Sequence, residues 1–170
     1  GSFIQDSRGR WFINLVIEVD DVHSCLNINN AVGVDLGKKE LITTSDGEAF
    51  ENPKFFYVSA KRLAMAQRAK KKRLVAKLHD KIKNQRKDYI NKVTTSILKE
   101  YDLIVIGNLH LGASKSTLDA AFGQVKSCFK NKAIRLGKTV LLVNEAWTTQ
   151  QCSCCKQHTG PRGLMGLSVR

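Results

Sequence analysis

The stretch Asn30 to Gly37, Asn-Ala-Val-Gly-Val-Asp-Leu-Gly, decides how the rest of the chain is interpreted. It predicts an apolar strand that carries one carboxylate, Asp35, between two apolar neighbours and breaks at Gly37. A charged residue inside an apolar strand is costly to bury unless it is hydrogen-bonded or faces a metal ion. We therefore interpret Asp35 as a metal-binding catalytic carboxylate, and the alternative is an aspartate that only leads a turn.

The pattern around this stretch predicts an α/β domain. Three short strands separated by turn residues predict an antiparallel meander, and the later apolar runs predict parallel strands reached through helical crossovers. This mixed sheet with flanking helices is the layout of an RNase H-like domain. The predicted strands cover 11–19, 31–36, 40–44, 48–50, 102–107 and 139–144, with a polar connection over 20–30, and the predicted helices cover about 58–73, 75–100 and 117–136.

Glu145 directly follows the last of these strands and is the second candidate metal ligand. Neighbouring central strands end at one edge of such a sheet, so Asp35 and Glu145 can face one another despite their separation in sequence. Paired carboxylates of this kind hold Mg²⁺ or Mn²⁺ ions that activate water and stabilise the leaving oxygen of a phosphodiester. The alternative is an exposed glutamate at a helix start, favoured there by the helix dipole.

The net charge of +13 is concentrated in one stretch, because residues 54–99 contain fifteen Lys or Arg and only two acids. Such a one-sign surface attracts a polyanion, and nucleic acid is the expected partner. Ordinary solvated helices would explain the apolar residues that recur at helical spacing along 75–100, but not the lack of acidic residues. A membrane-surface helix would need a broader apolar face. The predicted contacts are Arg68, Lys70, Lys71, Lys72, Arg73, Lys77, Lys81, Lys83, Arg86 and Lys87.

Cys152 and Cys155 have the spacing of half a zinc ribbon, which leaves two tetrahedral positions for other ligands. Cys154 is interpreted as a bystander, and His158 as either a third ligand or a surface histidine. Clustered cysteines without a spaced disulfide framework indicate a reducing, intracellular compartment, cytoplasm or nucleus. The longest apolar runs are too short to span a bilayer, so no membrane partner is expected.

The chain resembles the RuvC-type nuclease region of the TnpB family, transposon-encoded RNA-guided nucleases that are related to type V CRISPR effectors. The resemblance rests on Gly33-Val34-Asp35-Leu36-Gly37, the stretch 81–88, Leu103-Ile104-Val105-Ile106 and, most specifically, residues 143–155. The resemblance implies an RNA-guided DNA endonuclease with guide RNA and target DNA as partners, Mg²⁺ or Mn²⁺ at Asp35 and Glu145, and Zn²⁺ in the full-length protein. It also implies three parts: 1–29 ending a β-rich nucleic-acid-binding domain, 30–150 forming the nuclease, and 151–170 starting a zinc ribbon.

The sequence departs from the family pattern at Gly107, where many relatives carry the second catalytic glutamate. Glu145 fits the place of that glutamate in a rearranged subgroup. The family pattern also includes a second Cys pair and a third catalytic aspartate, which would lie beyond Arg170. The alternative is therefore a nuclease-inactive, RNA-guided binding protein or a transposase relic. Another RNase H-like nuclease, such as a junction resolvase or a cut-and-paste transposase, is disfavoured by the Cys knuckle after Glu145.

Overall fold

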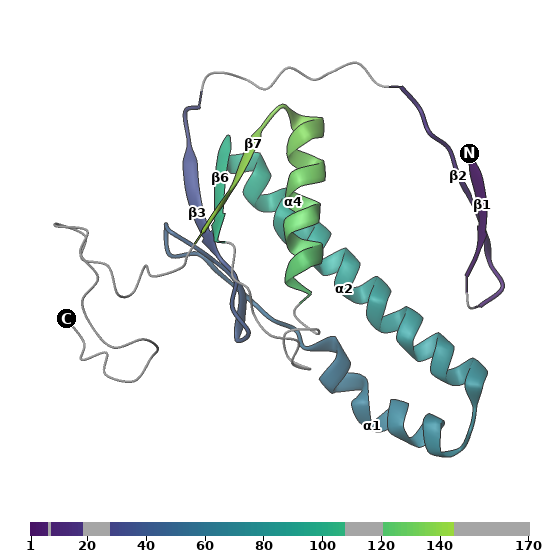
Figure 1. Cartoon of the computed structure of the whole chain (residues 1–170). Coiled ribbons are helices and arrows are strands. Elements are labelled where there is room, and N and C mark those ends of the chain that lie inside the picture. The colour runs from purple at the N-terminus through teal and green to yellow at the C-terminus, as the bar shows by residue number, and fades with distance from the viewer. Residues whose placement is uncertain (7, 19–27, 108–120, 145–170) are drawn as a thin grey trace.

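The computed structural model describes residues 1–6, 8–18, 28–107 and 121–144 of the 170-residue chain. A five-stranded sheet has the order β5-β4-β3-β6-β7, with helices α2 and α4 over one face (Figure 1). A separate two-stranded hairpin, β1-β2, lies on the other side of these helices (Figure 1). The elements are β1 Ser2–Gln5, β2 Trp11–Asn14, β3 Ala31–Asp35, β4 Glu40–Thr44, β5 Ala49–Glu51, α1 Phe55–Arg68, α2 Lys72–Glu100, β6 Leu103–Gly107, α4 Phe122–Leu136 and β7 Thr139–Val143.

The predicted mixed sheet is confirmed. Strand β4 runs antiparallel to both β3 and β5, whereas β6 runs parallel to both β3 and β7. Gly37 makes the return from β3 into β4 possible, because a Cβ at this position would lie 2.6 Å from the carbonyl oxygen of Glu40. Helices then carry the chain from β5 to β6 and from β6 to β7, as parallel pairing requires.

The core lies between the sheet and the two helices. Every second side chain along strand β3 and just after it points toward the helices and is almost fully buried, namely those of Val32, Val34 and Leu36. Ile104 of the neighbouring strand β6 and Phe129 of α4 are fully buried against them. Burial of such side chains contributes about 1.5 to 3 kcal/mol each, so this layer fixes which face of the sheet the helices cover.

The helix-free face of the sheet is less covered than the sequence predicts. The apolar run at 102–107 predicts a strand buried on both faces, but Leu103 and Val105 are only half-buried. On strand β7 the side chains of Leu141 and Val143 are exposed by 48% and 41%. Within the described residues, the helices therefore protect one face only.

The boundary between the first two helices differs from the prediction. Helix α1 ends at Arg68 instead of residue 73, and α2 begins at Lys72 instead of residue 75. Lys70 adopts the left-handed conformation with φ 53°, and the N–H of Lys71 bonds to the carbonyl of Ala66, which closes the helix end. A small apolar cluster of Leu63, Ala66 and Leu78 then holds the two helices together. Of the helices described, none contains the long apolar stretch that a bilayer-spanning segment requires.

The first strand is also shorter than predicted. The alternation over 11–19 predicts one strand, but β2 ends at Asn14 and pairs antiparallel with β1, which the sequence did not predict. The predicted connection 20–30 lies mainly outside the described residues. The start of the helix predicted at residue 117 also lies outside them, and α4 begins at Phe122.

Candidate carboxylate site and basic helical surface

Asp35 is the last residue of β3, at the carboxyl end of the central strand. Because Val32 and Val34 turn toward the helices, alternation puts Asp35 on the opposite face, where its side chain is exposed. Its partner across the antiparallel pair is Thr43 of β4. The exposed carboxylate needs no metal ion to offset a burial cost, so its position at the end of the strand is what favours a metal site.

Three parallel strands end together at this edge of the sheet. Val34 of β3 pairs with Ile106 of β6, and the following residue, Gly107, pairs with Val143 of β7. The carboxyl ends of the central strands therefore lie side by side next to Asp35. Since Gly107 has no side chain, strand β6 offers no ligand from its last position.

Glu145, Cys152 and Cys155 lie outside the described residues. The chain reaches the shared edge at Val143, two residues before Glu145 in the sequence. Across residues 1–6, 8–18, 28–107 and 121–144, no group of three or more His, Cys, Asp or Glu side chains is placed to hold a metal ion. The pairing of Asp35 with Glu145 thus stays a prediction.

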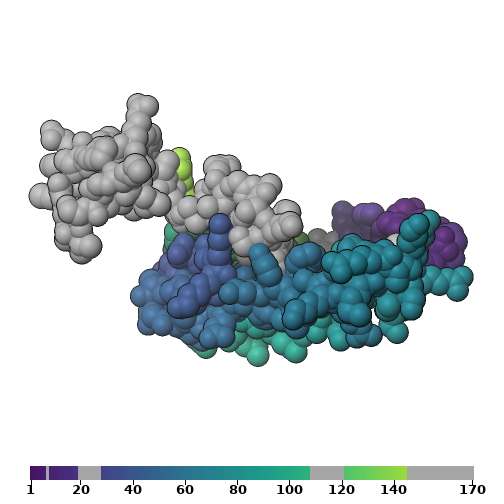
Figure 2. Space-filling model, turned by 90° about the horizontal axis from the view of Figure 1, so that it is seen from below, coloured from purple at the N-terminus to yellow at the C-terminus, as the bar shows by residue number. Residues whose placement is uncertain are grey.

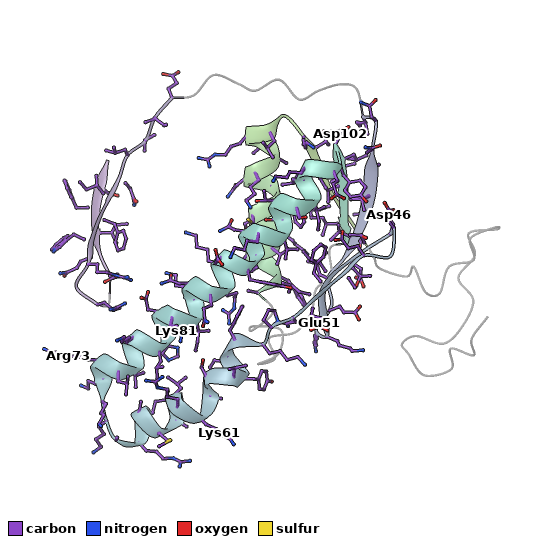
Figure 3. The ribbon with its side chains drawn as sticks, turned by 180° about the vertical axis from the view of Figure 1, so that it is seen from behind. Asp46, Glu51, Lys61, Arg73, Lys81 and Asp102 are labelled. Carbon is purple, nitrogen blue, oxygen red and sulfur yellow. The ribbon has the colours of Figure 1, made fainter. Side chains whose placement is uncertain are left out.

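The predicted nucleic-acid contacts gather on the hairpin formed by α1 and α2. Figure 3 labels Arg73 and Lys81 on the part of α2 that extends away from the sheet, and Lys61 on α1. Nine of the ten side chains are exposed, and Arg86 is half-buried. Arg68 ends α1, Lys70 and Lys71 form the turn, and α2 carries Lys72, Arg73, Lys77, Lys81, Lys83, Arg86 and Lys87.

The two acids of this stretch pair with cations outside that set. The carboxylate of Asp88 lies 2.8 Å from the amine of Lys92. The carboxylate of Asp80 lies 2.8 Å from Arg8 and 2.9 Å from Arg10, both on the N-terminal hairpin. Hydrogen bonds from Arg8 and then Arg10 lower the pKa of Asp80 below its ordinary value, although partial desolvation opposes them. Neither acid therefore forms an ion pair with the ten predicted contacts.

Sequence reasoning missed that α4 is also a helix without acidic residues. The signal is visible in the sequence as a second one-sign stretch, which carries Lys126, Lys130, Lys132 and Arg135. The amine of Lys132 has a structural task, since it donates to the carbonyl of Asn91 at 2.6 Å and to the hydroxyl of Thr95 at 2.6 Å. These bonds join α4 to α2, so this lysine is not available as a surface charge.

A polar cluster at the opposite edge of the sheet fixes the amino ends of the parallel strands. The Asp102 carboxylate accepts the backbone N–H groups of Asn29 at 3.2 Å and Asn30 at 3.4 Å, and lies 3.5 Å from the amine of Lys138. The N–H of Asn29 makes the largest contribution to lowering the pKa of Asp102, and Asn30 and Lys138 add to it while desolvation opposes it. The cluster joins the starts of β3, β6 and β7, so it helps to keep their far ends aligned beside Asp35.

Comparisons with known proteins place this architecture among transposon proteins. Residues 14–117 match the model of the OrfB_IS605 family, described as "Probable transposase", and residues 122–168 match a model described as "Cas12f1-like, TNB domain". The first match covers more than half of the chain. It includes Asp35, all ten predicted basic contacts and the strand that ends at Gly107.

Two curated relatives are similar over nearly the whole chain. "Putative RNA-guided DNA endonuclease InsQ" of Escherichia coli (strain K12) is 30% identical over 97% of this chain and 49% of its own length. A "Putative RNA-guided DNA endonuclease" of Streptomyces pristinaespiralis is 29% identical over 98% of this chain and 45% of its own length. The chain therefore spans about half the length of the curated relatives that it matches.

A solved structure shares the fold. A chain of the "Cryo-EM structure of the Cas12f1-sgRNA-target DNA complex" superposes with a TM-score of 0.54 over 90% of this chain and 44% of that chain, at 18% sequence identity. The shared fold agrees with the family match, which covers the strand of Asp35 and the basic hairpin. The chain belongs to the OrfB_IS605 family of transposon proteins.

Proposed function

We propose that the chain is the nuclease region of an intracellular, transposon-associated, RNA-guided DNA endonuclease. The observation that carries the proposal is Asp35, exposed at the edge where β3, β6 and β7 end together. The names of the two bacterial relatives support the reaction, and the guide RNA and target DNA in the Cas12f1 complex support the partners. We extend both the endonuclease reaction and the nucleic-acid partners to this chain as part of the proposal.

The fold proposed for residues 30–150 is the RuvC type of the RNase H-like class. An antiparallel meander joined to two parallel strands in the order β5-β4-β3-β6-β7 supports this assignment. The division of the chain follows from it, with 1–29 ending a preceding β-rich domain and 151–170 starting a zinc ribbon. The separate pairing of β1 with β2 is consistent with that division.

Asp35 and Glu145 are the proposed ligands for Mg²⁺ or Mn²⁺. When bound, such ions activate water for attack on the phosphodiester and stabilise its leaving oxygen. Asp35 would supply one anchoring charge from the end of β3, and Glu145 the second from beyond the end of β7. Gly107 cannot supply a ligand, which supports a glutamate placed after the next strand.

Guide RNA and target DNA are the proposed partners of the basic hairpin. In RNA-guided recognition, base pairing reads the sequence while the protein holds the nucleic acid by its shape and charge. The ten basic side chains of α1, α2 and their connecting turn suit this task, because lysines and arginines that contact phosphates position a helix without reading its bases.

Zinc is proposed to bind Cys152 and Cys155 together with ligands beyond Arg170, because structural zinc needs four donors. We expect the 170-residue chain to retain little zinc after dialysis against a mild chelator, and the full-length protein to retain it. In the full-length protein Cys152→Ser should release the metal, whereas Cys154→Ser should not. Zinc analysis by mass spectrometry checks this, and stoichiometric zinc in the 170-residue chain would contradict it.

A cleavage assay tests the proposed function. The full-length protein with a guide RNA should cut a matched DNA target in Mg²⁺, and should not cut it in excess chelator or with an unrelated guide. A glycine in place of a ligand at position 107 favours a second candidate, an RNA-guided protein that binds without cutting. Guided binding without cleavage in either Mg²⁺ or Mn²⁺ would reject the endonuclease in favour of that candidate.

A further inference from the structure

The N-terminal hairpin and α2 enclose a groove of about 1030 Å³ that is separate from Asp35. This volume is at the upper end of the roughly 300 to 1,000 Å³ found for pockets that bind small molecules. We propose that the groove binds single-stranded nucleic acid, with an unstacked base against Phe12 and its phosphates on lysines of α2. The inference rests on the nucleic-acid binding of the proposed function and not on its cleavage step.

The hairpin presents one aromatic side chain, that of Phe12, to the groove. Phe12 lines the groove, and its cross-strand partner Ile4 lies on the same face of the hairpin. The neighbouring residues Trp11 and Ile13 point to the other face, where they are exposed by 68% and 62%, against 48% for Phe12. The hairpin lies beside α2, on the side of that helix away from the sheet (Figure 1), and Figure 2 shows its purple atoms next to the teal atoms of the helices.

Ion pairs fix this face of the hairpin against α2. Asp80 on α2 accepts from both Arg8 and Arg10, and Asp6 accepts from the Nε of Arg10 at 2.6 Å. The guanidinium of Arg10 also lies 5.8 Å from the centre of the Phe12 ring, within reach of a cation–π contact. Partial desolvation opposes ionisation of Asp6, but the hydrogen bonds from Arg10 and Arg8 outweigh it and lower its pKa. The ring is therefore held in place before any ligand arrives.

The lining combines apolar surface with uncompensated positive charge. Val75 and Ala76 of α2 continue the apolar surface begun by Phe12. The two acids of the lining, Asp6 and Asp80, are already paired with arginines. The remaining charged side chains of the lining are those of Lys70, Lys72, Lys83 and Lys87.

A nucleotide of a single strand matches this lining, because it offers a flat base and an adjacent phosphate. Aromatic side chains that stack on bases, flanked by basic groups along the backbone, are how proteins bind single strands without reading their sequence. A duplex keeps its bases stacked inside the helix, so it cannot present one to Phe12 without unpairing. The groove should therefore distinguish single strands from duplexes, whereas the exposed lysines elsewhere on the hairpin of α1 and α2 should not.

The test compares Phe12→Ala with Trp11→Ala in the 170-residue chain. Binding of a fluorescent oligothymidylate should weaken about tenfold in Phe12→Ala, since loss of one base–aromatic stack has this size. Binding of a duplex should stay the same. Trp11→Ala is the matched control, because it removes a larger ring from the adjacent position on the opposite face, and its single-strand affinity should match that of the parent.

Two further measurements separate stacking from a loss of structure. Phe12→Leu keeps an apolar side chain for packing of the hairpin and should still lose the single-strand preference. Ultraviolet crosslinking of an oligonucleotide with 5-iodouracil, followed by mass spectrometry, should label Phe12 in the parent chain. Crosslinks at Trp11 in place of Phe12, or equal affinity of Phe12→Leu and parent for the single strand, would overturn the proposal.

The outcomes also distinguish this inference from the proposed function. If the parent chain binds single strands and duplexes and Phe12→Ala changes neither, the groove assignment fails while nucleic-acid binding stands. If Phe12→Ala weakens single-strand and duplex binding equally, the ring supports the fold and does not stack on a base, and the assignment fails. If the parent chain binds neither nucleic acid, the groove and the nucleic-acid part of the proposed function fail together.

Discussion

Asp35→Asn should reduce guided DNA cleavage by the full-length protein by more than about a hundredfold, because metal ions supply several kcal/mol of transition-state stabilisation and need an anchoring charge. The substitution keeps the size of the side chain and removes only its charge. Asp35 is exposed and ends its strand, so the fold and guided binding should be retained. Single-turnover cleavage measured over a range of Mg²⁺ concentrations, beside a gel-shift assay for binding, checks both expectations.

Asp46→Asn is the matched control for this experiment. Asp46 is a second exposed aspartate of the same sheet, in the turn between β4 and β5, and it accepts a 2.7 Å hydrogen bond from the hydroxyl of Tyr101. That bond makes the largest contribution to raising the pKa of Tyr101 to about 12, and desolvation and nearby carboxylates add to it. An asparagine oxygen can still accept the bond. Asp46→Asn should therefore cut at the parental rate. Parental cleavage by Asp35→Asn would reject the carboxylate assignment.

The same assay applied to Glu145→Gln tests the rearranged site. This variant should lose cleavage as fully as Asp35→Asn, because the second anchoring charge disappears while position 107 offers no replacement. If Glu145→Gln cuts at the parental rate while Asp35→Asn does not, the partner of Asp35 comes from elsewhere in the protein. The two variants therefore test the two carboxylates independently.

The sheet could be predicted from the sequence because its signals are local. The alternation of Val32, Val34 and Leu36 marks the buried face of β3, and the apolar runs of β6 and β7 have no helical period. Gly137 ends α4 in the left-handed conformation with φ 65°, as a glycine directly after the last residue of a predicted helix indicates. Each of these features depends on the chemistry of a few neighbouring residues.

The ends of α2 at Glu100 and α4 at Leu136 agree with the prediction, but the boundary between α1 and α2 could not be predicted because tertiary contacts decide it. Ala69, Lys70 and Lys71 favour a continued helix by intrinsic propensity, yet the chain turns there with Lys70 in a conformation more usual for glycine. The turn lets Leu63 of α1 pack against Leu78 of α2. Packing between residues that are distant in sequence outweighed local preference at this point.

In the candidate site, too, the features that depend on local sequence could be predicted and those that depend on distant contacts could not. Placing Asp35 at a strand end needed only the strand pattern, and the parallel pairing with β6 and β7 then brought three strand ends to one edge. The sequence could not predict which face of the sheet carries Asp35, because that depends on which face the helices cover. The ion pairs of Arg8 and Arg10 with Asp80 join residues about seventy positions apart, and no spacing rule reveals such a contact.

Replacing the four basic residues at the turn of the helical hairpin should remove much of the duplex affinity. Each phosphate contact contributes about 0.9 to the slope of log affinity against log salt, so loss of four contacts should flatten the slope by up to about 3.6. Affinity should fall most at low salt, where counterion release is most favourable. The variant carries Lys70→Gln, Lys71→Gln, Lys72→Gln and Arg73→Gln, and fluorescence anisotropy across a sodium chloride series measures the slope.

A second variant separates a local contact surface from net charge. It removes three lysines and one arginine that are equally exposed but dispersed over the molecule, so the total charge falls by the same amount. If the turn between α1 and α2 is the contact surface, this control should keep most of the parental slope. The four side chains that it removes do not lie together against one stretch of the DNA backbone. Equal flattening in both variants, or no change in the first, would contradict a localised phosphate contact at the turn. The control carries Lys54→Gln, Lys99→Gln, Lys130→Gln and Arg135→Gln.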